Sequence, residues 1–123
     1  MKILLTGKNG QVGFALHKKL STLGEIIATD RETLDLLNSN AVEAFIDQIK
    51  PDMIIHPAAY TAVDQAESET DLAYQTNVEA TQVLTKKAKQ LNLPLIYFST
   101  DYVFDGFKKE PYLEDDPTHP LSV

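Results

Sequence analysis

The sequence predicts an α/β fold in which a doubly wound parallel sheet carries helices on both faces. Two observations support this prediction. Short apolar stretches alternate with amphipathic stretches of helical period, and a glycine-rich turn follows the first apolar stretch. The chain has 123 residues, of which 43% are hydrophobic. This length suits one domain with one buried core and is too short for a two-domain layout.

Each predicted element has its own signal. Strands are expected at 2–6, 25–29, 53–56 and 95–98, and apolar stripes at helical spacing predict helices within 12–23, 42–49 and 71–91. Pro51 ends the second helix, Pro57 stops the third strand, and Pro94 opens the fourth. The fourth strand is apolar throughout, which is typical of a strand buried on both faces. With right-handed crossovers we expect the strand order 3-2-1-4, followed by a loop tail at 106–123.

Charge and composition narrow the classes of function. Eleven basic and 18 acidic residues give a net charge of −7, which disfavours a nucleic-acid partner. The chain has no cysteine, so disulfides, cysteine-ligated metals and a thiol nucleophile are excluded, and we expect a cytoplasmic protein. The first apolar run ends at Thr6 and Gly7, too early for a signal peptide or a membrane span, so no membrane partner is expected.

Three glycines follow the first predicted strand. Gly7, Gly10 and Gly13 have the spacing G-x-x-G-x-x-G at the start of the first predicted helix. Glycine permits a positive φ in a tight turn, lets the backbone approach a pyrophosphate, and allows close packing of helix on strand. The helix terminus then offers free N–H groups to an anion. A strand before and an amphipathic helix after favour a Rossmann-like dinucleotide site over a purely structural turn.

The end of the second predicted strand bears on the choice of cofactor. Asp30 is placed where a carboxylate accepts hydrogen bonds from the adenosine ribose, which favours NADH. Arg31 beside it could pair with the additional phosphate of NADPH. Both NADH and NADPH therefore stay open, and a solvated turn is the alternative interpretation of this dipeptide.

Metal sites are not expected. His17, His56 and His119 fall on a helix, a strand end and the tail, with no shared ligand spacing, and His56 is interpreted as structural. The acidic residues of the tail are interpreted as part of a solvated segment with no metal-binding role.

Three segments resemble the dTDP-4-dehydrorhamnose reductase family of extended short-chain dehydrogenases. They are "MKILLTGKNGQVG" at the start, "HPAAYTAVDQAE" at 56–67 and "STDYVFDG" at 99–106. The resemblance runs along the whole chain in the expected order. It implies hydride transfer from NADH or NADPH to a dTDP-4-keto-6-deoxy sugar, in dTDP-rhamnose biosynthesis for cell-wall polysaccharide.

The resemblance and the glycine turn together supply the candidate site residues. The phosphate loop and the ribose and adenine side are assigned Gly7, Gly10, Gln11, Val12, Gly13, Asp30, Arg31, Asp35 and Leu36. The nicotinamide side is assigned Ala59, Tyr60 and Thr61. Ala58, Asn77 and Ser99 are further cofactor-binding candidates, with a helix-surface amide as the alternative interpretation of Asn77. Thr100 matches the catalytic Ser/Thr that bonds the ketone oxygen, and Asp101 beside it is assigned to substrate.

The family pattern also indicates where the catalytic Tyr and Lys of the family would lie relative to this chain. The family's catalytic Tyr and Lys follow a P-L-x-V segment directly, and that segment matches Pro120–Val123. We therefore expect residues 1–105 to form a partial cofactor-binding domain that is inactive alone, with the tail leading toward the Tyr-Lys segment. The alternatives are a non-catalytic NAD(P)-binding regulatory module, or another extended short-chain enzyme acting on a nucleotide sugar. An exposed fourth strand would also let copies of the chain associate.

Overall fold

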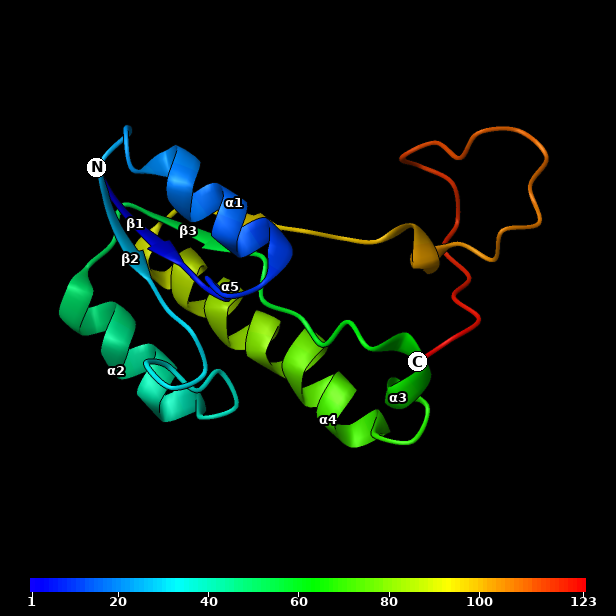
Figure 1. Cartoon of the computed structure of the whole chain (residues 1–123), viewed down its shortest axis with the longest axis horizontal. Helices are drawn as coiled ribbons and strands as arrows, with labels where there is room; N and C mark the ends of the chain where they lie inside the picture. Colours follow the sequence, from blue (N-terminus) through cyan, green and yellow to red (C-terminus); the bar gives the residue numbers. More distant parts are fainter.

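A computed structural model describes all residues, 1–123, and contains one four-stranded parallel sheet with helices on both faces (Figure 1). The predicted fold class is confirmed. The strands are β1 (Lys2–Leu5), β2 (Glu25–Ala28), β3 (Met53–His56) and β4 (Leu95–Tyr97). The helical elements are α1 (Gln11–Leu20), α2 (Ser39–Ile49), α3 (Val63–Ala66), α4 (Thr70–Tyr74), η1 (Gln75–Glu79), α5 (Ala80–Leu91) and η2 (Asp101–Val103).

The strand order is β2-β1-β3-β4, so the predicted order 3-2-1-4 is wrong. Strand β1 lies between β2 and β3, with Leu4 in register with Ile27 on one side and Ile54 on the other. The apolar face of α2 packs on Leu4 and Ile54, so the second crossover passes back over β1 instead of continuing outward from β2. This reversal makes the edge between β1 and β3 a topological switch point.

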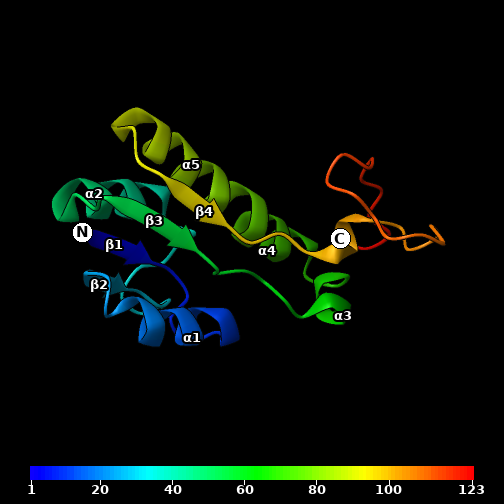
Figure 2. The same ribbon diagram turned by 90° about the horizontal axis from the view of Figure 1, so that it is seen from above.

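The reversal also places the helices in two layers (Figure 2). Right-handed crossovers running in opposite directions put their helices on opposite faces of a sheet. Helix α1 covers one face through Leu16 and Leu20, which pack against Ile3, Leu5 and Ile55. Helices α2 and α5 cover the other face, where Val42, Ile46 and Leu84 meet the inward side chains of β1 and β3. The switch point therefore opens between two helical layers.

An ion pair joins the two helices of the second layer. Lys87 of α5 is a buried lysine, 8% exposed, and its Nζ lies 2.7 Å from Oδ2 of Asp47 on α2. The aliphatic stem of such a lysine packs with apolar neighbours while its ammonium meets a carboxylate. The pair therefore aligns α2 with α5.

A single helical rod follows β3 and spans Thr70–Leu91. It consists of α4, the π-helical turn η1 and α5, in agreement with the long helix predicted at 71–91. Asn92 ends it with φ 54° and its N–H bonded to the carbonyl of Ala88. Insertions of π geometry are frequent at functional sites because the wider turn re-aims side chains.

Strand β4 forms an exposed edge, so its predicted burial on both faces is wrong. Ile96 and Tyr97 are 44% and 43% exposed. Because α1 packs over β1 and the neighbouring part of β3, the α1 side of β4, which carries Ile96, stays uncovered. Tyr97 points to the opposite face, where its ring lies beside that of His56 at the edge of the sheet. The tail (106–123) contains no helix or strand and extends away from β4 (Figure 2). No helix has both the length and the apolar character that a membrane span requires.

Candidate functional site

A cleft of about 920 Å³ opens where β1 and β3 end. Ligands of open α/β sheets bind at this position, outside the carboxyl ends of strands at a switch point, and the volume is in the range of small-molecule sites. Its lining comes from the turn after β1, the segment after β2, the segment after β3 and the start of the long helix. The lining residues are Gly7, Asn9, Gly10, Gln11, Val12, Gly13, Thr29, Asp30, Arg31, Leu34, Asp35, Leu36, Leu37, Pro57, Ala58, Ala59, Tyr60, Thr61, Leu72 and Thr76.

Two glycines of the turn after β1 are required by geometry. Gly7 has φ +65°, and a Cβ there would lie 2.9 Å from Cα of Ala58. A Cβ on Gly13 would lie 2.0 Å from the carbonyl oxygen of Gly7. Any larger residue at Gly13 would therefore push α1 away from the turn, so glycine provides the close packing of helix on strand that the sequence predicted.

The start of α1 faces the cleft without a cap. Gly10 is the N-cap residue, no side chain bonds the terminal N–H groups, and the first turn contains no acidic residue. A Cβ on Gly10 would meet only the Gly7 carbonyl, at 3.4 Å, and would otherwise project into open space. Uncapped N–H groups and the helix dipole attract anions, so this end of the cleft suits a phosphate or pyrophosphate.

The carboxylate of Asp30 follows β2 and closes one side of the cleft. Thr33 donates its backbone N–H to Oδ1 at 3.0 Å and its hydroxyl to the same oxygen at 2.8 Å. Nζ of Lys8 lies 3.0 Å from Oδ2. The Thr33 hydroxyl, followed by Lys8, holds the pKa of Asp30 well below its ordinary value, so the group stays ionised.

The segment after β3 forms the opposite wall and is clamped by the π-helical turn. Oδ1 of Asn77 accepts the backbone N–H of Tyr60 at 2.7 Å, and its Nδ2 donates to the Tyr60 carbonyl at 3.1 Å. The Tyr60 hydroxyl donates to Oε2 of Glu69 at 2.6 Å. This hydrogen bond raises the pKa of Tyr60 and lowers the pKa of Glu69. The wall is therefore bonded through both its backbone and its phenol.

Behind this wall lies His56, which is fully buried. Its Nδ1 is 2.7 Å from the hydroxyl of Thr6, and its Nε2 is 3.2 Å from the hydroxyl of Thr81. The Thr81 hydroxyl donates to the Asn77 carbonyl at 2.8 Å, so Nε2 carries the imidazole proton and donates it to Thr81. Burial lowers the pKa of His56 to about 4. His56 thus joins β1 to the helix carrying Asn77, while His17 lies on α1 and His119 in the tail.

The cleft brings together most of the residues predicted from the sequence. All the predicted phosphate-loop, ribose and adenine residues line it, as do Ala58, Ala59, Tyr60 and Thr61. Asn77 lies behind the wall and is bonded to it. Ser99, Thr100 and Asp101 follow β4 outside the lining, and the Thr100 hydroxyl accepts the backbone N–H of Tyr102 at 3.2 Å.

Sequence reasoning missed seven lining residues: Asn9, Thr29, Leu34, Leu37, Pro57, Leu72 and Thr76. Five of them are direct neighbours of predicted residues, so their proximity in sequence could have suggested them: Asn9, Thr29, Leu34, Leu37 and Pro57. Leu72 and Thr76 enter the cleft through the path of the long helix, for which no motif gives a signal.

The parallel sheet, the glycine turn, the uncapped helix and the acidic residue after β2 define the class: a Rossmann-like nucleotide-binding domain. The match with known proteins agrees. Residues 1–123 match the family described as RmlD substrate binding domain, and the chain belongs to this family. The family resemblance inferred from the sequence is confirmed.

Named relatives point the same way. A dTDP-4-dehydrorhamnose reductase of Burkholderia thailandensis is 44% identical over all of this chain and 41% of its own length. A crystal structure of such a reductase from Clostridium acetobutylicum superposes with TM-score 0.95 at 44% identity, covering 99% of this chain and 44% of that one. The Bacillus anthracis reductase in complex with NADP gives TM-score 0.93 at 38% identity, covering 98% and 43%. The chain spans about 40% of the length of the curated relatives it matches.

Proposed function

We propose that this chain is the NAD(P)H-binding part of a reductase that acts on a dTDP-4-keto-6-deoxy sugar, dTDP-4-dehydrorhamnose. The observation that carries the proposal is the cleft at the switch point, lined by the glycine turn and Asp30, in a member of this family. NADP bound to the Bacillus anthracis relative supports the same cofactor class. When bound, the cofactor supplies the hydride.

The chain's own residues have separate roles in this proposal. The uncapped end of α1 binds the pyrophosphate, and Gly10 keeps the approach open. The carboxylate of Asp30 accepts hydrogen bonds from the hydroxyls of the adenosine ribose, while Asp35 and Leu36 border the adenine. Ala59 and Thr61 lie along the nicotinamide half, on the wall that Asn77 holds in place. Residues 1–105 act as the nucleotide-binding unit.

The substrate end of the proposal depends on the segment after β4. Thr100 would bond the ketone oxygen and Asp101 would contact the sugar, as the family resemblance implies. Both are exposed in this chain, so their side chains are accessible. Tyr60 is the one phenol lining the cleft. Because its hydroxyl is bonded to Glu69 and its pKa is raised, it is a poor general acid.

Calorimetric titration of the chain with NADPH and with NADH tests the proposal. We expect binding by the wild type and none by Gly10→Val, because the valine side chain would occupy the place of the pyrophosphate. Gly106→Asn in the exposed tail, where a Cβ has no neighbour within 4 Å and asparagine tolerates the φ of +78°, is the control and retains binding. A folded wild-type chain that gives no heat with either nucleotide refutes the proposal.

Turnover separates cofactor binding from complete catalysis. With NADPH and the dTDP-4-keto sugar we expect no oxidation of NADPH by this chain, because Tyr60 does not supply a proton. Oxidation that disappears in Tyr60→Phe would show that Tyr60 serves as the acid after all.

A further inference from the structure

The carboxylate of Asp30 is bonded by the glycine turn as well as by Thr33. Nζ of Lys8 lies 3.0 Å from its Oδ2, and Nδ2 of Asn9 donates to the same oxygen at 3.2 Å. Thr33 occupies Oδ1 with two hydrogen bonds. The oxygen nearest the glycine turn therefore already has a cation and an amide donor beside it.

This arrangement changes what the ribose end of the cleft can accept. A carboxylate at this position in dinucleotide-binding folds bonds the ribose 2′-hydroxyl, and it repels a phosphate attached there. The Lys8 ammonium lies 3.0 Å from that carboxylate, just outside the lining of the cleft, so a group that bonds Asp30 from the cleft would also lie close to Lys8. The Lys8 ammonium has three donors, so it can bond Asp30 and a phosphate oxygen at the same time. Arg31 lines the cleft next to Asp30 and is exposed.

We propose that Lys8 is a specificity-determining residue, which allows the cleft to bind a nucleotide with a 2′-phosphate on its adenosine ribose despite the carboxylate of Asp30. The inference rests on the proposed function. Lys8 offsets the charge of Asp30 and donates to the phosphate, with Arg31 as a second cation. With an unphosphorylated ribose the hydroxyls bond Asp30 and Lys8 is dispensable. The cleft thus accepts both forms and needs Lys8 for one of them.

The competing role for Lys8 is purely structural. Its backbone N–H donates to the Thr29 carbonyl at 2.9 Å, so the loop is already joined to the end of β2 without the side chain. The side chains of Lys8 and Asp30 are 28% and 16% exposed, so both are half-buried and partly accessible to a ligand. A structural role would affect the two nucleotide forms equally, whereas the proposed role affects their ratio.

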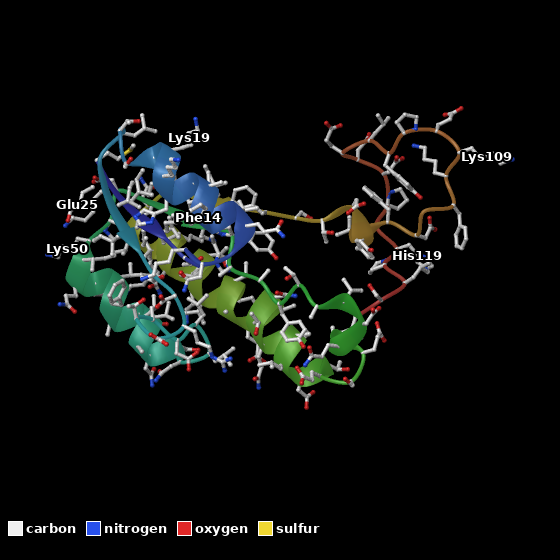
Figure 3. All side chains as sticks on the ribbon, in the orientation of Figure 1. Phe14, Lys19, Glu25, Lys50, Lys109 and His119 are labelled. Carbon is white, nitrogen blue, oxygen red and sulfur yellow. The ribbon has the colours of Figure 1, made fainter.

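The test uses the adenosine half of the cofactor alone. Calorimetry on the 123-residue chain compares adenosine 2′,5′-bisphosphate with adenosine 5′-monophosphate, which differ only in the 2′-phosphate. We expect Lys8→Met to weaken the binding of the bisphosphate about tenfold or more, because one charge-assisted hydrogen bond is lost. The same variant should weaken the binding of the monophosphate less than twofold. Lys8→Arg retains the preference. Lys19→Met, the same change on the outer side of α1, leaves both affinities unchanged (Figure 3).

A second variant removes the carboxylate that Lys8 offsets. Asp30→Asn combined with Lys8→Met should recover part of the bisphosphate affinity, because the repulsion is gone. Equal weakening of both probes by Lys8→Met, or no change in either, overturns the role of Lys8 and leaves the proposed function intact. If the folded wild type binds neither probe, the proposed function fails and the role of Lys8 fails with it.

Discussion

Lowering the pH from 7 to 5 should destabilise this chain through His56 alone among its groups with a shifted pKa. The imidazole is buried, and its pKa falls from an ordinary value of 6.5 to about 4 on folding. Between these values the unfolded chain binds a proton that the folded chain does not, so the free energy of unfolding falls as the pH falls. The loss amounts to about 2 kcal/mol between pH 7 and pH 5. The shifted carboxyl groups have ordinary values of 3.8 and 4.5, below this window.

Urea denaturation at pH 7, 6 and 5, followed by circular dichroism, measures this loss. His56→Asn removes the titrating group and keeps an amide near Thr6, at a cost of about 1–3 kcal/mol at pH 7. Its free energy of unfolding should then change by less than about 0.5 kcal/mol between pH 7 and 5. The exposed His17 provides the control, because His17→Asn should keep the wild-type slope. The reasoning is refuted if His56→Asn loses as much stability over this range as the wild type does.

Three further predictions concern the turn, the wall and the sheet edge. Gly13→Ala should lower the free energy of unfolding by about 2–4 kcal/mol, because its Cβ would lie 2.0 Å from a backbone oxygen. Gly10→Ala, whose Cβ faces open space, should lower it by about 1 kcal/mol or less. Equal losses for the two variants in urea denaturation would contradict this contrast. Asn77→Ala should cost about 2–3 kcal/mol for two lost hydrogen bonds, and Asn77→Asp at least as much, because its carboxylate oxygen would repel the Tyr60 carbonyl that Nδ2 now bonds. Melts at pH 7 measure both, and a neutral Asn77→Ala would rule out the clamp. The exposed edge of β4 should raise the mass measured by light scattering with concentration, and Ile96→Lys should suppress the rise; a monomer at every concentration would exclude association through this edge.

Local patterns in the sequence were enough to predict the four strands, the three long helical segments and the glycine turn, but not the short helices α3 and η2. The period of the apolar residues separates strand from helix, and the three roles of glycine depend on short-range geometry that Gly7 and Gly13 realise. The cleft residues next to that turn follow from the same motif. These predictions succeeded because each depends on residues close together in the chain.

Pairing and coverage depend on distant residues, and there the predictions were wrong. The position of β3 beside β1 is set by the side of the sheet on which α2 buries Val42 and Ile46, which the period of α2 alone does not specify. The apolar run of β4 says that its residues can be buried, whereas burial requires a neighbour on that side. Asn77, a cofactor-binding candidate from the sequence, lies in the π-helical turn η1 and bonds the backbone of Tyr60, and no local pattern in the sequence predicts that turn.

Because helical layers lie on either side of the switch point, a ligand in the cleft would affect several parts of the backbone together. The cleft lining extends from Gly7 to Thr76 and draws on three strand ends, with α1 and the long helix on opposite faces of the sheet. A molecule bound there would tie the turn after β1 and the segment after β2, which Lys8 and Asp30 already join, to the segment after β3 and the long helix. When a ligand binds, the amide hydrogens of the turns after β1, β2 and β3 should therefore all exchange more slowly with solvent, rather than those of one loop only.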